Sequence, residues 1–217
     1  MSNKVIKVIT ILLIAASVLI GLYAYPQLPE RVASHWNAAG EVDGYMSRFW
    51  GVFILPIILV AMYLLLIFLP RIDPFKKNIE SFKQYYNGII LTIIVFLFYV
   101  YILSIAANLG WEFNMTLAII PMMAIFIFVL GALLKKTKRN WFMGIRTPWT
   151  LSSDSVWDKT HLLGSKLFMM AGVITIFGIF FPKYTLYLGI FPLIIAAVVT
   201  IIYSYIFFQQ EQRQSSK

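Results

Sequence analysis

The sequence predicts an all-α polytopic membrane protein with six transmembrane helices. Of its 217 residues, 60% are hydrophobic and only 12% are charged, whereas about a quarter of the residues in a soluble domain are charged. The mean hydropathy is +0.81. Six apolar segments each come close to the roughly 20 residues that a helix needs to cross a bilayer. Most of the protein surface should therefore face lipid.

The first predicted span is Val5–Tyr25, with Lys4 and Lys7 at its start. A secretory signal peptide is the competing interpretation, because such peptides also combine early cations with an apolar stretch. The run is long for a signal peptide, and Tyr23 and Tyr25 near its end leave no small-x-small cleavage site. We therefore predict an uncleaved transmembrane helix.

A polar segment, Pro26–Arg48, separates the first span from the second. Pro26 and Pro29 favour an extended entry into this segment. Asn37–Gly40 and Asp43-Gly44 are turn signals. These features predict a short hairpin.

Five further apolar segments complete the predicted set. They are Phe49–Leu69, Asn87–Ala107, Met115–Leu134, Leu162–Phe181 and Tyr184–Phe208. The connections that we expect between them are a basic loop at Pro70–Tyr86, a short turn at Asn108–Asn114, a long polar loop at residues 135–161 and a tight turn at Pro182-Lys183. A polar tail, Gln209–Lys217, follows the sixth span.

The distribution of cations predicts the orientation, because Lys and Arg collect in cytoplasmic loops. An inside N-terminus places 15 of the 18 cations on the cytoplasmic side and leaves Arg31, Arg48 and Lys183 outside. Both termini should then be cytoplasmic, and Pro26–Arg48 should be extracellular. The net charge of +9 is explained by this asymmetry, so we expect no direct contact with nucleic acid.

Three of the spans share a proline at similar depth: Pro56, Pro121 and Pro192. A proline inside a helix frees a carbonyl one turn earlier and favours a kink. This weak repeat predicts three helical hairpins, each with a kinked second helix; the alternative is that proline is simply commoner in membrane helices. The three units would be residues 1–69 with the extracellular loop 26–48, residues 70–134, and residues 135–217 with the cytoplasmic loop 135–161.

The predicted spans contain no Asp, Glu, Arg or His, and Lys166 near the start of the fifth is their one deep cation. Ionisable groups inside a membrane are costly and mark ion or proton pathways. Their absence argues against a proton-coupled transporter or an ion pump. The Ser and Thr side chains and the glycines Gly131, Gly172 and Gly178 should serve helix packing.

No catalytic, cofactor or metal site is predicted. The chain has no cysteine, and no P-loop or HExxH motif is present. His35 and His161 should lie on opposite sides of the membrane. His35 with Glu41 and Asp43 is a weak metal pattern, since it combines one histidine with two carboxylates on a turn-rich loop. Ser152–Asp154 is better explained as a cap before a short helix, Ser155–His161.

The loop at residues 135–161 combines cations with aromatic residues, among them Trp141, Trp149 and Trp157. One interpretation is that the aromatics anchor the loop at the headgroup level. The other is a protein-docking surface, because Trp and Arg are enriched among binding hot spots. Gly144, Thr147 and Pro148 would then form a rigid turn that presents Arg146 and Trp149.

These residues also carry a resemblance to a known family. The run from Asn140 to Leu151, followed by Val156-Trp157 and Thr160-His161, resembles the signature of the SdpI family. In the first polar loop, Leu28-Pro29-Glu30, His35-Trp36-Asn37, Gly40 and Asp43-Gly44-Tyr45 resemble the small domain of unknown function that often precedes it.

The resemblance implies a bacterial plasma-membrane protein that protects its own cell from a secreted, sporulation-delaying peptide toxin. It also implies a receptor role, in which the toxin-bound protein captures a winged-helix autorepressor at the membrane. Candidate toxin contacts are His35, Trp36, Asn37, Gly40 and Asp43. Candidate cytoplasmic contacts are Asn140, Trp141, Gly144, Arg146, Thr147, Pro148, Trp149, Trp157 and His161. The alternatives are a transporter or exporter of a toxic peptide or amphiphile, and a membrane scaffold.

Overall fold

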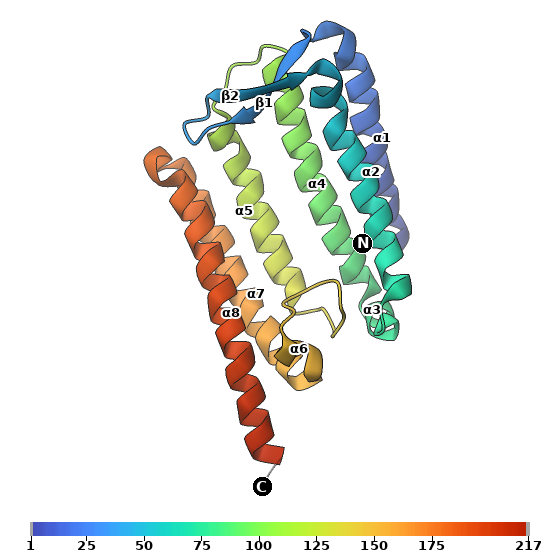
Figure 1. Ribbon diagram of the computed structural model, residues 1–217, viewed down its shortest axis with the longest axis vertical. Coiled ribbons are helices and arrows are strands. Elements are labelled where there is room, and N and C mark those ends of the chain that lie inside the picture. The colour runs from blue at the N-terminus through green and yellow to red at the C-terminus, as the bar shows by residue number, and fades with distance from the viewer. Residues whose placement is uncertain (1, 216–217) are drawn as a thin grey trace.

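Six long helices dominate the computed structural model, which describes residues 2–215 (Figure 1). Each is long and apolar enough to cross a membrane. The six are α1 Asn3–Ala24, α2 Arg48–Ile72, α4 Lys83–Asn108, α5 Met115–Leu134, α7 Asp154–Ile176 and α8 Thr185–Ser215. The predicted six-helix membrane fold is confirmed. Lys217, which we counted among the cytoplasmic cations, lies outside the described residues.

The two polar segments lie at opposite ends of this bundle (Figure 1). The strands β1 Arg31–Trp36 and β2 Val42–Ser47 cross one end, which we call the hairpin end. Residues 135–153 and the short helices α3 Lys76–Ser81 and α6 Pro148–Ser152 lie at the other, the loop end, where α1 begins and α8 ends. The side of the membrane that each end faces stays a prediction.

The helices pack in two groups. The first group contains α1, α2 and α4, and the second contains α5, α7 and α8, with α4 against α5 joining them. Glycines let α5 and α7 approach closely: a Cβ on Gly131 would lie 2.7 Å from the Met169 nitrogen, and one on Gly172 would lie 2.8 Å from the Ala124 oxygen. Gly131 and Gly172 are therefore close-packing points, as expected of small residues between membrane helices.

The predicted hairpin is present, since β1 and β2 pair antiparallel. Asn37 organises the turn, because its Oδ1 accepts hydrogen bonds from the Ala39 and Glu41 nitrogens at 2.9 and 3.1 Å. Asn108 on α4 binds β1 as a neighbouring strand would. Its Oδ1 accepts from the Ala33 nitrogen at 2.7 Å, and its Nδ2 donates to the Ala33 oxygen at 3.0 Å. The hairpin is thus held on the bundle rather than projecting from it.

Three expected boundaries are wrong, each because a helix continues into polar sequence. Pro70–Tyr86 is mostly helical, with α3 and the start of α4 inside it. The short helix Ser155–His161 is the beginning of α7, although Ser153 caps it as expected by accepting a hydrogen bond from the Val156 nitrogen. The tail from Gln209 to Ser215 continues α8. Hydropathy locates the part of a helix in lipid and says little about where the helix ends.

Three prolines, Pro56, Pro121 and Pro192, lie inside α2, α5 and α8. All three helices begin at the hairpin end, so the prolines share the half of the bundle near it, as the sequence predicted. Their role as kinks, and the division of the chain into three hairpin units, stay predictions.

Candidate functional site

The segment 135–153 folds around the side chain of Asn140, which is completely buried. Its Nδ2 donates to the Lys138 and Met143 oxygens at 2.8 and 2.9 Å. Its Oδ1 accepts from the Phe142 and Met143 nitrogens at 2.9 and 2.6 Å. An amide can donate twice and accept twice, so this one side chain satisfies four backbone groups and determines the turn.

Trp157 and His161, one turn apart on α7, form the floor beneath this turn. Both side chains are buried, and their rings stack with centroids 3.9 Å apart. Trp157 Nε1 donates to the Thr137 oxygen at 3.1 Å. His161 Nε2 accepts from the Ile145 nitrogen at 2.9 Å, and Nδ1 lies 2.8 Å from the Trp157 oxygen. A neutral ring with its proton on Nδ1 satisfies both contacts, so His161 joins the loop to α7.

Gly144 passes directly over these two rings. Its φ of +112° is in the region that side chains rarely adopt. A Cβ there would overlap His161 Nε2 and would lie 3.1 Å from the Trp157 ring. Backbone conformation and space therefore both require glycine at this position.

The second half of the segment is tied to α8. Thr147 and Thr150 form a capping box at the start of α6, in which each side chain accepts from the other residue's nitrogen. Thr147 Oγ1 also donates to Ser204 Oγ on α8 at 3.0 Å. The Trp149 ring packs on Tyr205, with ring centroids 5.1 Å apart. The loop is thus a folded cap over the ends of α7 and α8.

Sequence reasoning missed the residue that ties this cap to the first group of helices. Asp73, between α2 and α3, is buried. Its Oδ2 accepts from the Trp141 nitrogen at 2.9 Å, and its Oδ1 accepts from the Phe75 nitrogen at 2.6 Å. Nearby, Asn78 donates to the Arg139 oxygen at 2.8 Å. The sequence shows Asp73 only as a single acid beside Pro74 at the end of an apolar run. Its partner, Trp141, is 68 residues away, so no local pattern indicates this contact.

The predicted cytoplasmic contacts divide into buried and accessible side chains. Asn140, Thr147, Trp157 and His161 are buried. Their side chains shape the loop and are closed to a docked protein in this conformation. Trp141, Gly144, Arg146 and Pro148 are exposed, and Trp149 is half-buried. Arg146 Nη1 donates to the Trp141 oxygen at 2.7 Å, which holds these two accessible residues together.

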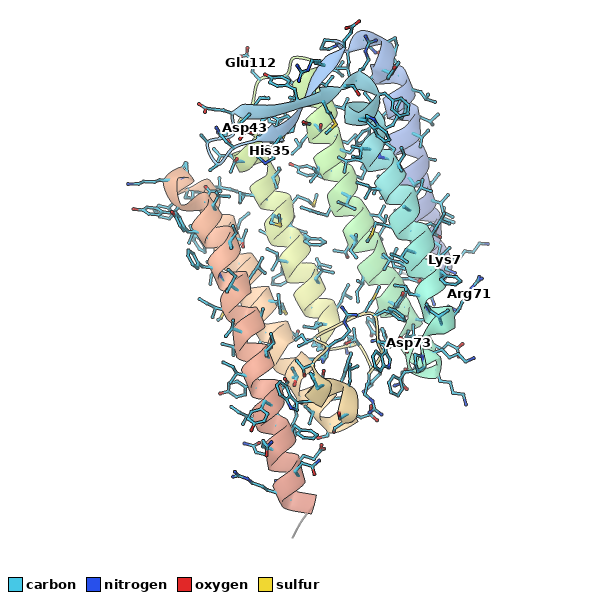
Figure 2. All side chains as sticks on the ribbon, viewed as in Figure 1. Lys7, His35, Asp43, Arg71, Asp73 and Glu112 are labelled. Carbon is cyan, nitrogen blue, oxygen red and sulfur yellow. The ribbon has the colours of Figure 1, made fainter. Side chains whose placement is uncertain are left out.

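The predicted toxin contacts at the hairpin end divide into exposed and half-buried residues. His35 and Asp43 face each other across β1 and β2 with Nδ1 2.5 Å from Oδ1, and their side chains are 71% and 43% exposed. Figure 2 shows both at the hairpin end of the bundle. Asn37 and Gly40 form the turn, where Gly40 has a φ of +83°, and Trp36 is half-buried. Within residues 2–215, no three His or acidic side chains are grouped as metal ligands would be.

The two candidate regions match two families. Residues 12–60 match a domain of unknown function, DUF1648, and residues 136–204 match the SdpI/YfhL protein family. The resemblance to the SdpI family is confirmed. The first match contains the hairpin, and the second contains the folded cap, α7 and most of α8.

A curated relative extends the similarity to nearly the whole chain. This is the immunity protein SdpI of Bacillus subtilis (strain 168), which is 26% identical over 205 residues, covering 94% of this chain and 96% of the relative. No solved structure matches the chain. The similarity therefore extends over both the hairpin and the cap of this chain.

Proposed function

We propose that this multi-pass membrane protein, which resembles the SdpI family, is an immunity protein that protects its cell from a secreted peptide toxin. The observation that carries the proposal is the similarity to an immunity protein along 94% of the chain. The polar parts of the two matched regions, the hairpin and the cap, lie at opposite ends of the bundle, which suits a protein that meets different partners on the two sides of a membrane.

In this proposal the hairpin end faces outward and meets the toxin. His35 and Asp43 provide an exposed polar pair there. The asymmetry of the cations supports this orientation. Because Asn108 and Asn114 bind the hairpin backbone at Ala33 and Ala39, a toxin bound to the hairpin would act on α4 and on the start of α5.

Survival of a toxin-sensitive cell tests the immunity function. Cells that express the protein should keep their viability and membrane potential when purified toxin is added, whereas cells with an empty vector should lose both. The double variant His35→Ala/Asp43→Ala should lose protection, because it removes the exposed pair and leaves the buried face of the hairpin intact. Full sensitivity of cells with normal amounts of the wild-type protein in the membrane would contradict the proposal.

We further propose that the exposed part of the cap captures a cytoplasmic autorepressor. Trp141, which is 49% exposed, Arg146 and Pro148 form its accessible surface. Tryptophan and arginine are the residues that most often dominate binding energies at interfaces. Since Asp73 and Ser204 hold the cap on both groups of helices, a change in how the groups pack would move this surface.

The double variant Trp141→Ala/Arg146→Ala should abolish repressor capture and retain immunity. Trp149 is left in place, because its replacement would also remove its packing on Tyr205 and so weaken the fold of the cap. Capture is measured by co-sedimentation of the repressor with membranes in the presence of toxin. The matched control, Arg31→Ala/Trp111→Ala, changes the same residue types at the hairpin end and should retain capture. Simultaneous loss of capture and immunity at normal protein levels would refute this division of roles.

A further inference from the structure

A cavity of about 520 Å³ opens at the loop end, on the side away from the cap. It lies between α1, α2, α3 and α4. Its deep wall is formed by the buried residues Ile79, Tyr86, Asn87 and Ile90. Tyr86 donates to the Leu66 oxygen at 2.7 Å, and Asn87 donates to Asn3 Oδ1 at 2.9 Å, so both polar groups in this wall already have protein partners.

The rim of the cavity is strongly basic. Lys7, Arg71, Lys76 and Lys83 line it, together with a single acid, Glu80. Figure 2 shows Lys7 and Arg71 along the same side of the bundle, near the lower ends of α1 and α2. The ion pairs His35–Asp43, Lys138–Asp158 and Arg139–Asp154 include none of these four cations. Four cations around one hollow repel one another, and an anion in the hollow would offset that repulsion.

The position of the cavity identifies the class of anion. The cations come from the second turn of α1, the first turn of α4, the last turn of α2 and the helix α3. This is the level at which transmembrane helices meet lipid headgroups. Toward the middle of the bundle the lining becomes apolar, with Tyr63, Ile67 and Ile90. A basic rim above an apolar wall matches a phosphate group that carries acyl chains, and basic pockets between transmembrane helices bind such lipids.

We propose that this cavity is a binding site for the phosphate headgroup of an anionic glycerophospholipid. Lys7, Arg71 and Lys83 provide charge for the phosphate, and Tyr63 and Ile67 contact the start of an acyl chain. Arginine suits this role because its planar fork can donate two hydrogen bonds to a phosphate. The site does not involve the cap or the hairpin, so the proposal is independent of the immunity function.

Titration of the purified protein in uncharged detergent tests the proposal. The two lipid probes are phosphatidylglycerol and phosphatidylcholine with identical acyl chains, and bound lipid is counted by native mass spectrometry. The wild-type protein should bind phosphatidylglycerol more tightly than phosphatidylcholine. The triple variant Lys7→Gln/Arg71→Gln/Lys83→Gln should bind phosphatidylglycerol about 100-fold more weakly, since each basic side chain near an anionic lipid contributes about a fivefold effect.

A second triple variant tests whether lipid binding depends on cations in the cavity or only on the total charge of the protein. Lys4→Gln/Lys77→Gln/Lys135→Gln removes three exposed cations from the same end that do not line the cavity. It should bind phosphatidylglycerol as the wild type does, and equal loss in both triple variants would overturn the proposal. Inorganic phosphate is the third probe. If it displaces phosphatidylglycerol at matched concentrations, the site recognises free phosphate and the lipid assignment is wrong; failure to displace it supports the lipid.

Discussion

Replacing Gly144 with alanine is expected to lower the free energy of unfolding by about 3 to 4 kcal/mol. The change adds two costs. The backbone at φ +112° strains any residue with a Cβ, by about 1 to 3 kcal/mol. The new methyl group also overlaps His161 Nε2 and crowds the Trp157 ring, and overpacking of this kind costs about 1 to 3 kcal/mol. If residue 144 moved away from His161 to relieve this overlap, the hydrogen bond from the Ile145 nitrogen to His161 would break.

Gly110 provides the matched control, because it has a φ of +93° but nothing within 4 Å of an added Cβ. Gly110→Ala should therefore show only the backbone cost. Gly189→Ala, at an open position in α8, should be neutral or slightly stabilising, since alanine favours helix. Stability is measured by denaturant unfolding in detergent micelles. Equal losses for Gly144→Ala and Gly110→Ala would contradict the packing of the cap on His161.

Replacing Trp157 with alanine is expected to cost about 3 to 5 kcal/mol, the usual cost of truncating a buried aromatic side chain to alanine. The ring is completely buried and stacks on His161. Its truncation leaves a cavity beneath the cap and leaves the Thr137 oxygen without the donor at 3.1 Å. We expect the loop 135–153 to become sensitive to proteases in this variant, while the bundle stays in the membrane.

Two variants resolve the origin of this loss. Trp157→Phe retains a stacking ring but removes the donor, and should cost about 1 to 3 kcal/mol, as expected when a buried acceptor loses its partner. Trp141→Ala removes the same type of side chain from the loop above Trp157, at a position that is half exposed, and should cost less than about 1 kcal/mol. Protease resistance of the loop in Trp157→Ala equal to that in Trp141→Ala would show that Trp157 does not support the cap.

Local sequence patterns were sufficient for the architecture. Each spanning helix carries its own apolar run, and the backbone groups of a helix are satisfied within it, so six helices could be predicted without any tertiary information. The turn signal at Asn37–Gly40 predicted the hairpin from local sequence, whereas Asp43-Gly44, also expected as a turn, is wrong because it lies within β2. The helix ends were predicted less well, because α7 and α8 continue into polar residues that favour helix as well as apolar ones do.

The roles of the motif residues depended on partners that are distant in the sequence. Asn140, Trp157 and His161 were expected as contacts for a partner, but the fold buries Asn140 inside the cap and Trp157 and His161 beneath it. Asp73 joins the cap to the first group of helices by accepting a hydrogen bond from Trp141, which is 68 residues away. The basic cavity is likewise lined by side chains from four helices. The sequence alone determined which segments form helices long and apolar enough to cross a membrane, and it predicted that the two polar segments lie at opposite ends of the bundle. Only the tertiary structure decided which polar side chains are buried, because burial of a polar group requires a hydrogen-bonding partner, and the packing of the helices supplies that partner.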